Sequence, residues 1–397
     1  MNITVVCPFY YPNLIGGAEV SIKMLAEWLA SNDFNVQIVS FDGRADSETI
    51  NKVKVRRYPL ISAKGLSLTL MYPVLRAMQK FEGTTDLYHV YDAYPTIGAG
   101  LYKTLKGKRQ VVATLDNYAG FCPVSTAICS ACDKFPSRMR CLFEQTSTLE
   151  KPLGFAYASF YPLLSRLARK VDKYIAVSNT VAELYVKYGF DSQKIVVIPN
   201  FIDIESMKVD GTRSTNKKFN ILYVGAVSRH KGIDLLIQAL KIIESATPYA
   251  HLTLVGKGKW LSYCRSLVKK LQIEDKVTFT GYVDNQKLRE IYSGADVFVH
   301  PARWNEPFGI TLLEALSYEI PCIVSDTVSP EIVGDAGLIF KHEDVEDLAE
   351  KLMTFITDEG LQGRLRHNCD KVLRRYDIDL VARRIANVYY DLVKDSS

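Results

Sequence analysis

Short apolar runs that alternate with helical segments are the feature that most constrains the fold of this chain. The first run, ITVVC at residues 3–7, is followed by a turn-rich segment, a helical segment and a second run at residues 36–40. A strand, a helix and a strand in this order predict a βαβ unit, and therefore a parallel sheet covered by helices on both faces. Similar strands are expected at residues 87–91, 111–115, 174–178 and 195–199.

The same pattern starts again in the second half of the chain. Residues 205–219 have no apolar periodicity and are predicted to be a linker. Beyond them, strands are expected at residues 221–225, 252–256, 277–281, 297–301 and 322–325. The sequence therefore predicts two tandem, Rossmann-like, doubly wound α/β domains, over residues 1–200 and 201–374, that face a ligand cleft. The tail at about 375–397 is expected to be an amphipathic helix, with Leu380, Val381, Ile385, Val388 and Leu392 at helical spacing.

Composition excludes several classes of protein. With 397 residues, of which 48% are hydrophobic and 23% charged, the chain can build two or three globular domains, so disorder and a small disulfide scaffold are excluded. A net charge of +5 is too small for a dedicated nucleic-acid binder, but it suits an anionic ligand or an anionic membrane surface. No apolar stretch is long enough to cross a bilayer and the N-terminus lacks the basic region of a secretory signal, so a cytoplasmic location is expected.

Two glycines lie where the first helix is expected to begin. Unpaired N–H groups and the helix dipole favour an anion at such a place, so Gly16 and Gly17 are interpreted either as a phosphate-binding turn or as a plain tight turn. The strings GAGLYK at 98 and GKGKWL at 256 each resemble half of a dinucleotide fingerprint. Both lack its third glycine and its acidic residue, which argues against an NAD site.

Charged residues next to predicted strands are the candidates for chemistry in the second half. Arg229 and Lys231 follow the strand at 221–225 and could meet a diphosphate, although an exposed basic turn has the same pattern. Glu306 is expected on a loop after the strand at 297–301, and Glu314 in a helix that opens near Gly309. A carboxylate on a loop that leads into a glycine at a helix N-terminus is again typical of an anion-binding arrangement.

Metal binding has little support in the sequence. The acidic strings at 343–347 and 377–379 are interpreted as residues that begin helices, and no catalytic metal is assigned to them. Four cysteines with a C-x2-C centre could hold a zinc ion, but their outer spacings match no standard zinc module, so free thiols are the alternative. These cysteines are Cys122, Cys129, Cys132 and Cys141.

Residues 152–165, PLGFAYASFYPLLS, are uncharged and rich in aromatic side chains. The stretch is too short to span a membrane. It could rest on a lipid surface or on a lipid-linked acceptor, or it could be a helix buried under the following strand.

Taken in order, these strings resemble the retaining nucleotide-sugar glycosyltransferases of family 4, which have the GT-B fold. The resemblance covers nearly the whole chain, through YPNLIGGAE, YIAVSNT, IVVIPNFID, ILYVGAVSRHKGIDLLIQAL, LTLVGKG, VTFTGYV and ADVFVHPARWNEPFGITLLEALSYEIPCIVSD. It implies that the N-terminal domain binds the acceptor and the C-terminal domain binds the sugar nucleotide. It also implies that the last helix crosses back onto the N-terminal domain.

The resemblance also assigns roles to single residues. It implies that Glu306 contacts the donor sugar, that Glu314 holds the ribose hydroxyls, and that Lys231 with the Gly16-Gly17 loop stabilises the departing diphosphate. Such electrostatic catalysis needs no catalytic metal or other cofactor. Further donor-binding positions implied by the match are Arg229, Gly256, Val283 and the backbone of Phe308, Gly309, Ile310 and Thr311.

Two positions depart from the family pattern. Ala226 stands where many relatives carry an Arg, so Arg229 is a candidate substitute. Asp116 stands where relatives often have a His, and it is a candidate to contact an acceptor hydroxyl or the donor sugar.

The resemblance implies a retaining enzyme that transfers a hexose from a UDP- or GDP-sugar to a glycan or lipid-linked glycan, in cell-surface polysaccharide or glycoconjugate synthesis. Peripheral association with the inner face of a membrane is a further expectation, and nucleic acid is not an expected partner. Related folds also host epimerases and phosphorylases, and nothing in the sequence points to the lysine-bound pyridoxal phosphate of a phosphorylase. The alternative is a non-catalytic subunit that binds nucleotide sugar within a glycan-assembly complex.

Overall fold

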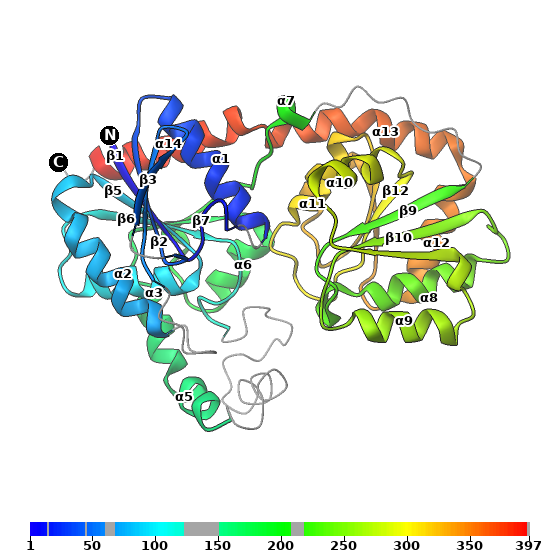
Figure 1. Ribbon diagram of the computed structural model, residues 1–397, viewed down its shortest axis with the longest axis horizontal. Coiled ribbons are helices and arrows are strands. Elements are labelled where there is room, and N and C mark those ends of the chain that lie inside the picture. The colour runs from blue at the N-terminus through cyan, green and yellow to red at the C-terminus, as the bar shows by residue number, and fades with distance from the viewer. Residues whose placement is uncertain (14–15, 44–45, 60–67, 123–150, 208–217, 395–397) are drawn as a thin grey trace. The chain divides into compact units, whose positions relative to one another are not determined.

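The computed structural model describes residues 1–13, 16–43, 46–59, 68–122, 151–207 and 218–394. The chain divides into two compact units, one of Met1–Asn200 with Ile378–Ser397 and one of Phe201–Asp377 (Figure 1). Each unit is a largely parallel sheet with helices on both faces, which confirms the predicted pair of doubly wound α/β domains. Of the predicted linker, residues 208–217 lie outside the described residues, and the residues before them form the short helix α7 (Ile204–Met207).

The first unit is built on an eight-stranded sheet in the order β3-β4-β2-β1-β5-β6-β7-β8. All neighbours are parallel except β3 and β4, which form an antiparallel pair. Strands β2, β4 and β3 lie on one side of β1, and β5 to β8 lie on the other side. The strand order therefore reverses between β1 and β5. The strands are β1 (Asn2–Cys7), β2 (Asn35–Ser40), β3 (Asp46–Ile50), β4 (Val53–Arg57), β5 (Leu87–Tyr91), β6 (Gln110–Leu115), β7 (Lys173–Ala176) and β8 (Ile195–Val197).

Helices cover both faces of this sheet. Helix α1 packs beside α14 on one face, and α2 packs beside α3 on the other (Figure 1). Helix α5 approaches α3 closely at Gly100, where a Cβ atom would lie 1.8 Å from the carbonyl oxygen of Leu167. The helices of this unit are α1 (Gly17–Ser31), α2 (Leu68–Phe81), α3 (Ala93–Thr104), α5 (Lys151–Ala168), α6 (Asn179–Lys187) and α14 (Ile378–Lys394).

The second unit is built on a six-stranded sheet in the order β11-β10-β9-β12-β13-β14. Its strand pairs are all parallel, and the order reverses between β9 and β12. The strands are β9 (Phe219–Val224), β10 (Ala250–Val255), β11 (Val277–Gly281), β12 (Val297–His300), β13 (Cys322–Ser325) and β14 (Gly337–Phe340). The helices are α8 (Ile233–Ile243), α9 (Leu261–Lys270), α10 (Asn285–Ser293), α11 (Ile310–Ser317), α12 (Val345–Thr357) and α13 (Glu359–Leu373), together with α7.

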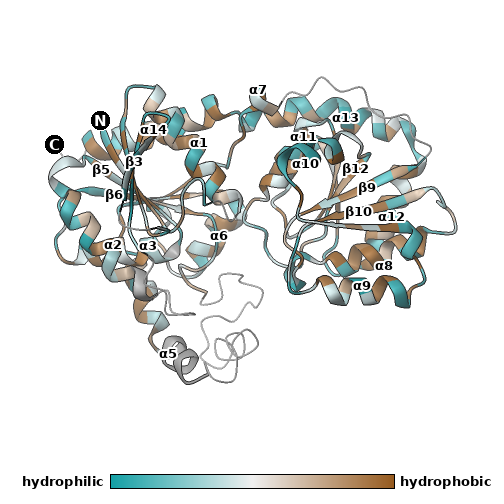
Figure 2. Ribbon diagram, viewed as in Figure 1, coloured by the Kyte–Doolittle hydropathy of each residue, from teal (hydrophilic) through white to brown (hydrophobic). Residues whose placement is uncertain are grey.

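The core of the second unit lies between its sheet and the helices α8, α9 and α12. Helix α8 buries nearly every apolar side chain and is largely hydrophobic in Figure 2. Strands β12 and β13 are buried along their whole length, as expected for strands that are covered on both faces. The acidic residues that were expected to begin helices do so, since Asp344 caps α12 and Asp379 lies in the first turn of α14.

Helix α14 returns to the first unit, as predicted. Its buried side chains are Val381, Ala382, Ile385, Ala386 and Tyr389. Leu380, which was expected on the apolar stripe, is instead half exposed, because the stripe runs one residue further along the helix. At the far end of α14, the hydroxyl of Tyr389 lies 2.5 Å from Nδ1 of His89 on β5. Burial lowers the pKa of His89 to about 3, so this contact is one between neutral groups.

Helix α5 is buried on one side and exposed on the other. Tyr161 and Leu164 are buried, and the hydroxyl of Tyr161 donates a hydrogen bond to the carbonyl oxygen of Ala119. Phe160 and Leu163 are 62% and 58% exposed. Within the described part of the chain, none of the helices has both the length and the apolar character needed to cross a membrane.

Candidate active site

Two loops meet at the point where the strand order of the second sheet reverses. One follows β9 and carries a single 3-10 turn, Arg229–Lys231, and the other follows β12 and carries Glu306. In open α/β sheets, the loops at such a reversal form the usual ligand site. Here they bring together two predicted residues, since Nζ of Lys231 lies 2.6 Å from Oε2 of Glu306. Both side chains are largely buried, with 15% and 7% of their surfaces exposed.

Two further side chains donate to the same oxygen of Glu306. Nε2 of His300 lies 2.9 Å from Oε2, and Nε1 of Trp304 lies 2.8 Å from it. Burial alone would raise the pKa of the Glu306 carboxyl, but the charge of Lys231 and the hydrogen bonds from His300 and Lys231 hold that pKa well below its usual range. Glu306 is therefore a buried carboxylate anion. The sequence did not single out His300 or Trp304, although both lie within six residues of Glu306 in the string VFVHPARWNEPFG.

The backbone of the two loops is tied together beside this cluster. Gly232 has a φ of +67°, and a Cβ atom there would lie 1.8 Å from the carbonyl oxygen of Pro301, so only glycine fits. Arg303 forms a two-pronged ion pair with Asp234 at 2.5 and 2.8 Å, and its backbone N–H donates to the carbonyl oxygen of His230. These contacts fix the turn that carries Lys231 relative to the loop that carries Glu306.

Helix α11 begins directly after this loop. Gly309 precedes its first turn with a φ of +83°, and Phe308 before it is buried. The first N–H groups of a helix have no partner within the helix and carry a partial positive charge. Ile310 and Thr311 belong to this first turn, so the predicted anion site has the backbone geometry that it requires.

Glu314 lies one turn further along α11 and has a different partner. Its Oε2 accepts a hydrogen bond of 2.7 Å from the hydroxyl of Tyr292, whose ring stacks on that of Tyr318 at 5.2 Å between centroids. Burial raises the pKa of the Glu314 carboxyl, and the bond from Tyr292 opposes this rise. Glu314 thus lies on α11 and Glu306 on the loop before it, and each carboxylate has its own hydrogen-bond donors.

The ends of neighbouring strands make backbone contact at the same edge of the sheet. Gly256, after β10, has a φ of +140°, and a Cβ atom there would lie 1.9 Å from the carbonyl oxygen of Gly225. The N–H of Gly256 donates to the carbonyl oxygen of Gly281 at 2.8 Å. Val283 lies two residues beyond Gly281 and is half-buried. The predicted position Gly256 therefore requires glycine for packing within the sheet edge, whatever ligand lies beyond it.

Arg229 and Lys231 share one turn but point to different partners. The guanidinium of Arg229 lies 6.0 Å from the ring centre of Trp260, and Arg229 is exposed. Ala226, which replaces the Arg of many relatives, is also exposed, and its carbonyl oxygen accepts a hydrogen bond from Tyr223. Arg229 is thus a cation on the same loop as Ala226, outside the buried Glu306 cluster.

The predicted phosphate turn of the first unit lies at the start of α1. Gly16 precedes the helix with an extended φ of −158°, and its N–H donates to Oε2 of Glu19 at 2.7 Å. The N–H of Gly16, which was predicted to bind a phosphate, is thus bound by the carboxylate of Glu19. The four-residue string Gly16-x-x-Glu19 could have shown this, because its spacing is that of a capping box.

The loop before Gly16 is held by a buried ion pair. Arg57 and Asp42 are joined by contacts of 3.0 Å, and their side chains are 9% and 1% exposed. Asp42 accepts from the N–H of Tyr10 at 2.9 Å, and Arg57 donates to the carbonyl oxygen of Tyr11 at 2.5 Å. The sequence did not single out this pair.

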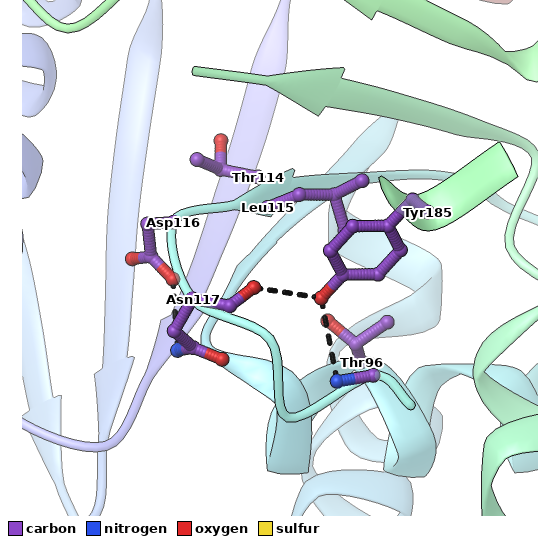
Figure 3. Close-up of a pocket in the computed structure, with 7 residues that line it drawn as sticks. Thr96, Thr114, Leu115, Asp116, Asn117 and Tyr185 are labelled. Carbon is purple, nitrogen blue, oxygen red and sulfur yellow. Dashed lines mark hydrogen bonds between the residues drawn. The ribbon is translucent and has the colours of Figure 1, made fainter. Parts of the chain in front are cut away.

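Asp116 lies in a narrow pocket of the first unit, at the carboxyl end of β6 (Figure 3). The hydroxyl of Tyr185 donates to the carbonyl oxygen of Asn117 at 2.9 Å and accepts from the N–H of Gly120 at 3.3 Å, which closes one side of the pocket. Burial, with a contribution from the charge of Asp92, raises the pKa of Asp116 to about 8. Its carboxyl group is therefore mainly protonated at neutral pH and can donate as well as accept a hydrogen bond.

The proposed cysteine cluster is only partly within the described residues. Cys122 is buried, whereas Cys129, Cys132 and Cys141 lie outside the described residues. Among the residues that the structure does describe, no group of three or more His, Cys, Asp and Glu side chains is arranged to hold a metal ion.

Comparisons with known proteins agree with this architecture. The family model described as Glycosyl transferases group 1 matches residues 207–373, and the model described as Glycosyltransferase Family 4 matches residues 15–206. The chain belongs to this family of glycosyltransferases, as its sequence had indicated.

Individual relatives span almost the whole chain. An uncharacterised glycosyltransferase of Methanocaldococcus jannaschii is 27% identical over 98% of both chains. The phosphatidylinositol N-acetylglucosaminyltransferase GPI3 subunit of Saccharomyces cerevisiae is 24% identical over 100% of this chain and 84% of its own. Among solved structures, HepE of Anabaena in complex with UDP has a TM-score of 0.72 at 18% identity, and the match covers 98% of this chain and 100% of that one. This likeness shows that the fold is that of GT-B glycosyltransferases.

Proposed function

We propose that this glycosyltransferase moves a hexose from a UDP- or GDP-sugar to a glycan or lipid-linked glycan with retention of anomeric configuration. The observation that carries the proposal is the buried Lys231–Glu306 pair at the strand-order reversal, beside the N-terminus of α11. A cation and a helix N-terminus suit a departing diphosphate, and a carboxylate anion suits the hydroxyls of a sugar. The relative HepE, solved with UDP, supports a nucleotide of this kind.

In the proposed reaction, the bond between the anomeric carbon and the diphosphate oxygen breaks as the acceptor oxygen bonds to the same face of the sugar. The leaving phosphate oxygen takes the proton of the acceptor hydroxyl, so no protein base is required. Lys231 and the first N–H groups of α11 stabilise the negative charge that develops on the diphosphate. Glu306 orients the sugar through its hydroxyls, and Glu314 accepts from the ribose hydroxyls. These steps need no catalytic metal.

Nucleotide binding tests the proposal directly. We expect calorimetry to show binding of UDP or GDP, but not of NAD, and we expect Lys231→Ala to weaken that binding by about 1 to 3 kcal/mol, as the loss of a charge-assisted contact. The matched control is Lys241→Ala, which removes an exposed lysine at the opposite end of α8, where it pairs with Glu244. No binding by the wild-type protein would contradict the proposal. Binding without transfer to any acceptor would favour the non-catalytic subunit instead.

Asp116 gives a prediction for the acceptor side. If its protonated carboxyl donates to a substrate hydroxyl, activity is highest below a pH of about 8 and falls as the pH rises through that value. Asp116→Asn should remove this basic limb, because an amide does not ionise. The raised pKa also predicts that the free energy of unfolding decreases between pH 4 and 8, where the unfolded chain has already lost this proton. A pH–rate profile and urea titrations at several pH values measure both effects, and an unchanged basic limb in Asp116→Asn would contradict the assignment.

Peripheral membrane binding is the remaining part of the proposal. Phe160 and Leu163 expose large apolar side chains on α5, and Arg166 follows one turn later on the exposed side. Apolar insertion next to a cation is the usual pattern of binding to an anionic lipid surface. We expect the protein to co-sediment with vesicles that contain phosphatidylglycerol at low salt, and Phe160→Ser/Leu163→Ser to reduce the bound fraction several-fold. The control Leu105→Ser changes a similarly exposed residue outside α5, and an equal loss there, or no binding by the wild type, would contradict this part.

A further inference from the structure

The Glu306 carboxylate has more donors on one oxygen than that oxygen can satisfy well. Lys231, His300 and Trp304 all place a nitrogen within 2.6 to 2.9 Å of Oε2. A carboxylate oxygen has two lone pairs, so two of these donors are enough to fill it. One of the three is therefore in excess.

The three donors differ in how firmly they are held. His300 is the last residue of β12, is 2% exposed, and has its ring stacked near those of Tyr223 and Phe298 at 6.4 and 6.5 Å. Trp304 belongs to the same loop as Glu306, two residues away. Lys231 comes from the other loop on a flexible four-carbon chain. Its side chain is 15% exposed, against 7% for that of Glu306. Lys231 is thus the donor whose position in the chain holds it least firmly.

A diphosphate would compete for this lysine with an advantage in charge. It carries at least two negative charges against the single charge of Glu306, so the ammonium group gains Coulomb energy by moving to it. Once Lys231 has left, His300 and Trp304 still fill both lone pairs of Oε2 and hold the carboxylate in place. The other oxygen of Glu306, Oε1, can then accept a hydrogen bond from a sugar hydroxyl while Oε2 stays held by His300 and Trp304.

We propose that Lys231 is an exchangeable partner of Glu306, which the donor diphosphate removes, and that His300 and Trp304 are positioning residues that keep the carboxylate in register for the sugar after the exchange. This inference rests on the proposed function. It extends that function by assigning roles to His300 and Trp304 and by giving Lys231 two alternative anionic partners.

Trp304 provides a direct optical test of the exchange. Nζ of Lys231 lies 5.0 Å from the centre of the Trp304 ring, so its departure changes the electrostatic field at the indole. The chain has three tryptophans, and Trp28→Phe/Trp260→Phe leaves Trp304 as the only emitter. Titration with UDP or GDP, whichever calorimetry shows to bind, should change the emission of Trp304 with a midpoint equal to the calorimetric Kd. In the same background, Lys231→Met should abolish most of that change at saturating nucleotide.

An unchanged Trp304 emission at saturation, with binding proven by calorimetry, would overturn the exchange while leaving the proposed function standing. A change of equal size in Lys231→Met would overturn it as well. Failure of the wild type to bind any nucleoside diphosphate would overturn both.

Variants of His300 test its positioning role. His300→Phe keeps a planar ring but removes the donor, whereas His300→Gln keeps an N–H that can reach Glu306. We expect His300→Phe to lower the kcat of sugar-nucleotide hydrolysis at least ten-fold with the Kd for the nucleoside diphosphate within three-fold of the wild type, and His300→Gln to restore much of kcat. The control His251→Phe removes a histidine of β10 that bonds Thr278. Equal losses in kcat and in nucleotide affinity, or no recovery with Gln, would show that His300 only supports the fold.

Discussion

Glu306→Ala should abolish sugar transfer and leave nucleotide binding intact. In the proposed reaction the carboxylate orients the donor sugar, and removal of one preorganised polar contact in an active site typically lowers kcat by about 10² to 10³. UDP or GDP should bind as tightly as to the wild type or more tightly, because Lys231 loses the partner with which the diphosphate competes. Steady-state turnover of the sugar nucleotide and calorimetry measure the two effects.

The matched control is Glu290→Ala, which removes an exposed carboxylate of α10 that pairs with Lys287. It should change neither turnover nor affinity. Transfer at the wild-type rate in Glu306→Ala would defeat the assignment of this site.

Arg57→Met should strongly destabilise the first unit. It leaves the carboxylate of Asp42, with 1% of its side chain exposed, without its only positive partner among the described ion pairs. Removal of one member of a buried ion pair typically costs about 3 to 5 kcal/mol. It also frees the loop at Tyr10 and Tyr11, which Arg57 and Asp42 hold by hydrogen bonds.

Urea unfolding followed by the fluorescence of Trp28, which lies in α1 of the same unit, measures this effect. Arg56→Met on the same strand is the control, since Arg56 bonds only the side chain of Gln37 and covers the ring of Phe81. We expect a small shift for this control. An equal urea midpoint for Arg57→Met and the wild type would show that the ion pair is not a determinant of stability.

The sequence predicted most of the strands, including the edge strands β8 and β11, and missed β3, β4 and β14. Buried parallel strands such as β1 and β12 are continuous apolar runs, which identifies them without any alignment. Strands β3 and β4 form a polar pair at one edge, with sequences DSETI and VKVRR, and β14 is a short edge strand. Strands β3 and β4 contain no apolar run that could mark them, whereas β14 is a four-residue apolar run, GLIF, that the sequence analysis missed.

The candidate site was predictable where it depends on local sequence. Lys231 and Glu306 each follow a strand that the apolar pattern locates, and both loops lie at the reversal of strand order. The hydrogen bonds of His300 and Trp304 to one oxygen depend on how the loop folds back, which no spacing rule gives. The partners Asp42 and Arg57 are likewise brought together by the sheet, after β2 and at the end of β4.

The place of α14 in the first unit affects how the protein can be synthesised. The buried side of α14, with Tyr389 on His89, completes a unit whose other elements all precede residue 201. A ribosome that adds about 5 to 20 residues per second needs roughly 10 to 35 seconds to make the intervening second unit. During that interval the first sheet lacks its last covering helix, and the nascent chain presents an apolar face that a chaperone could bind.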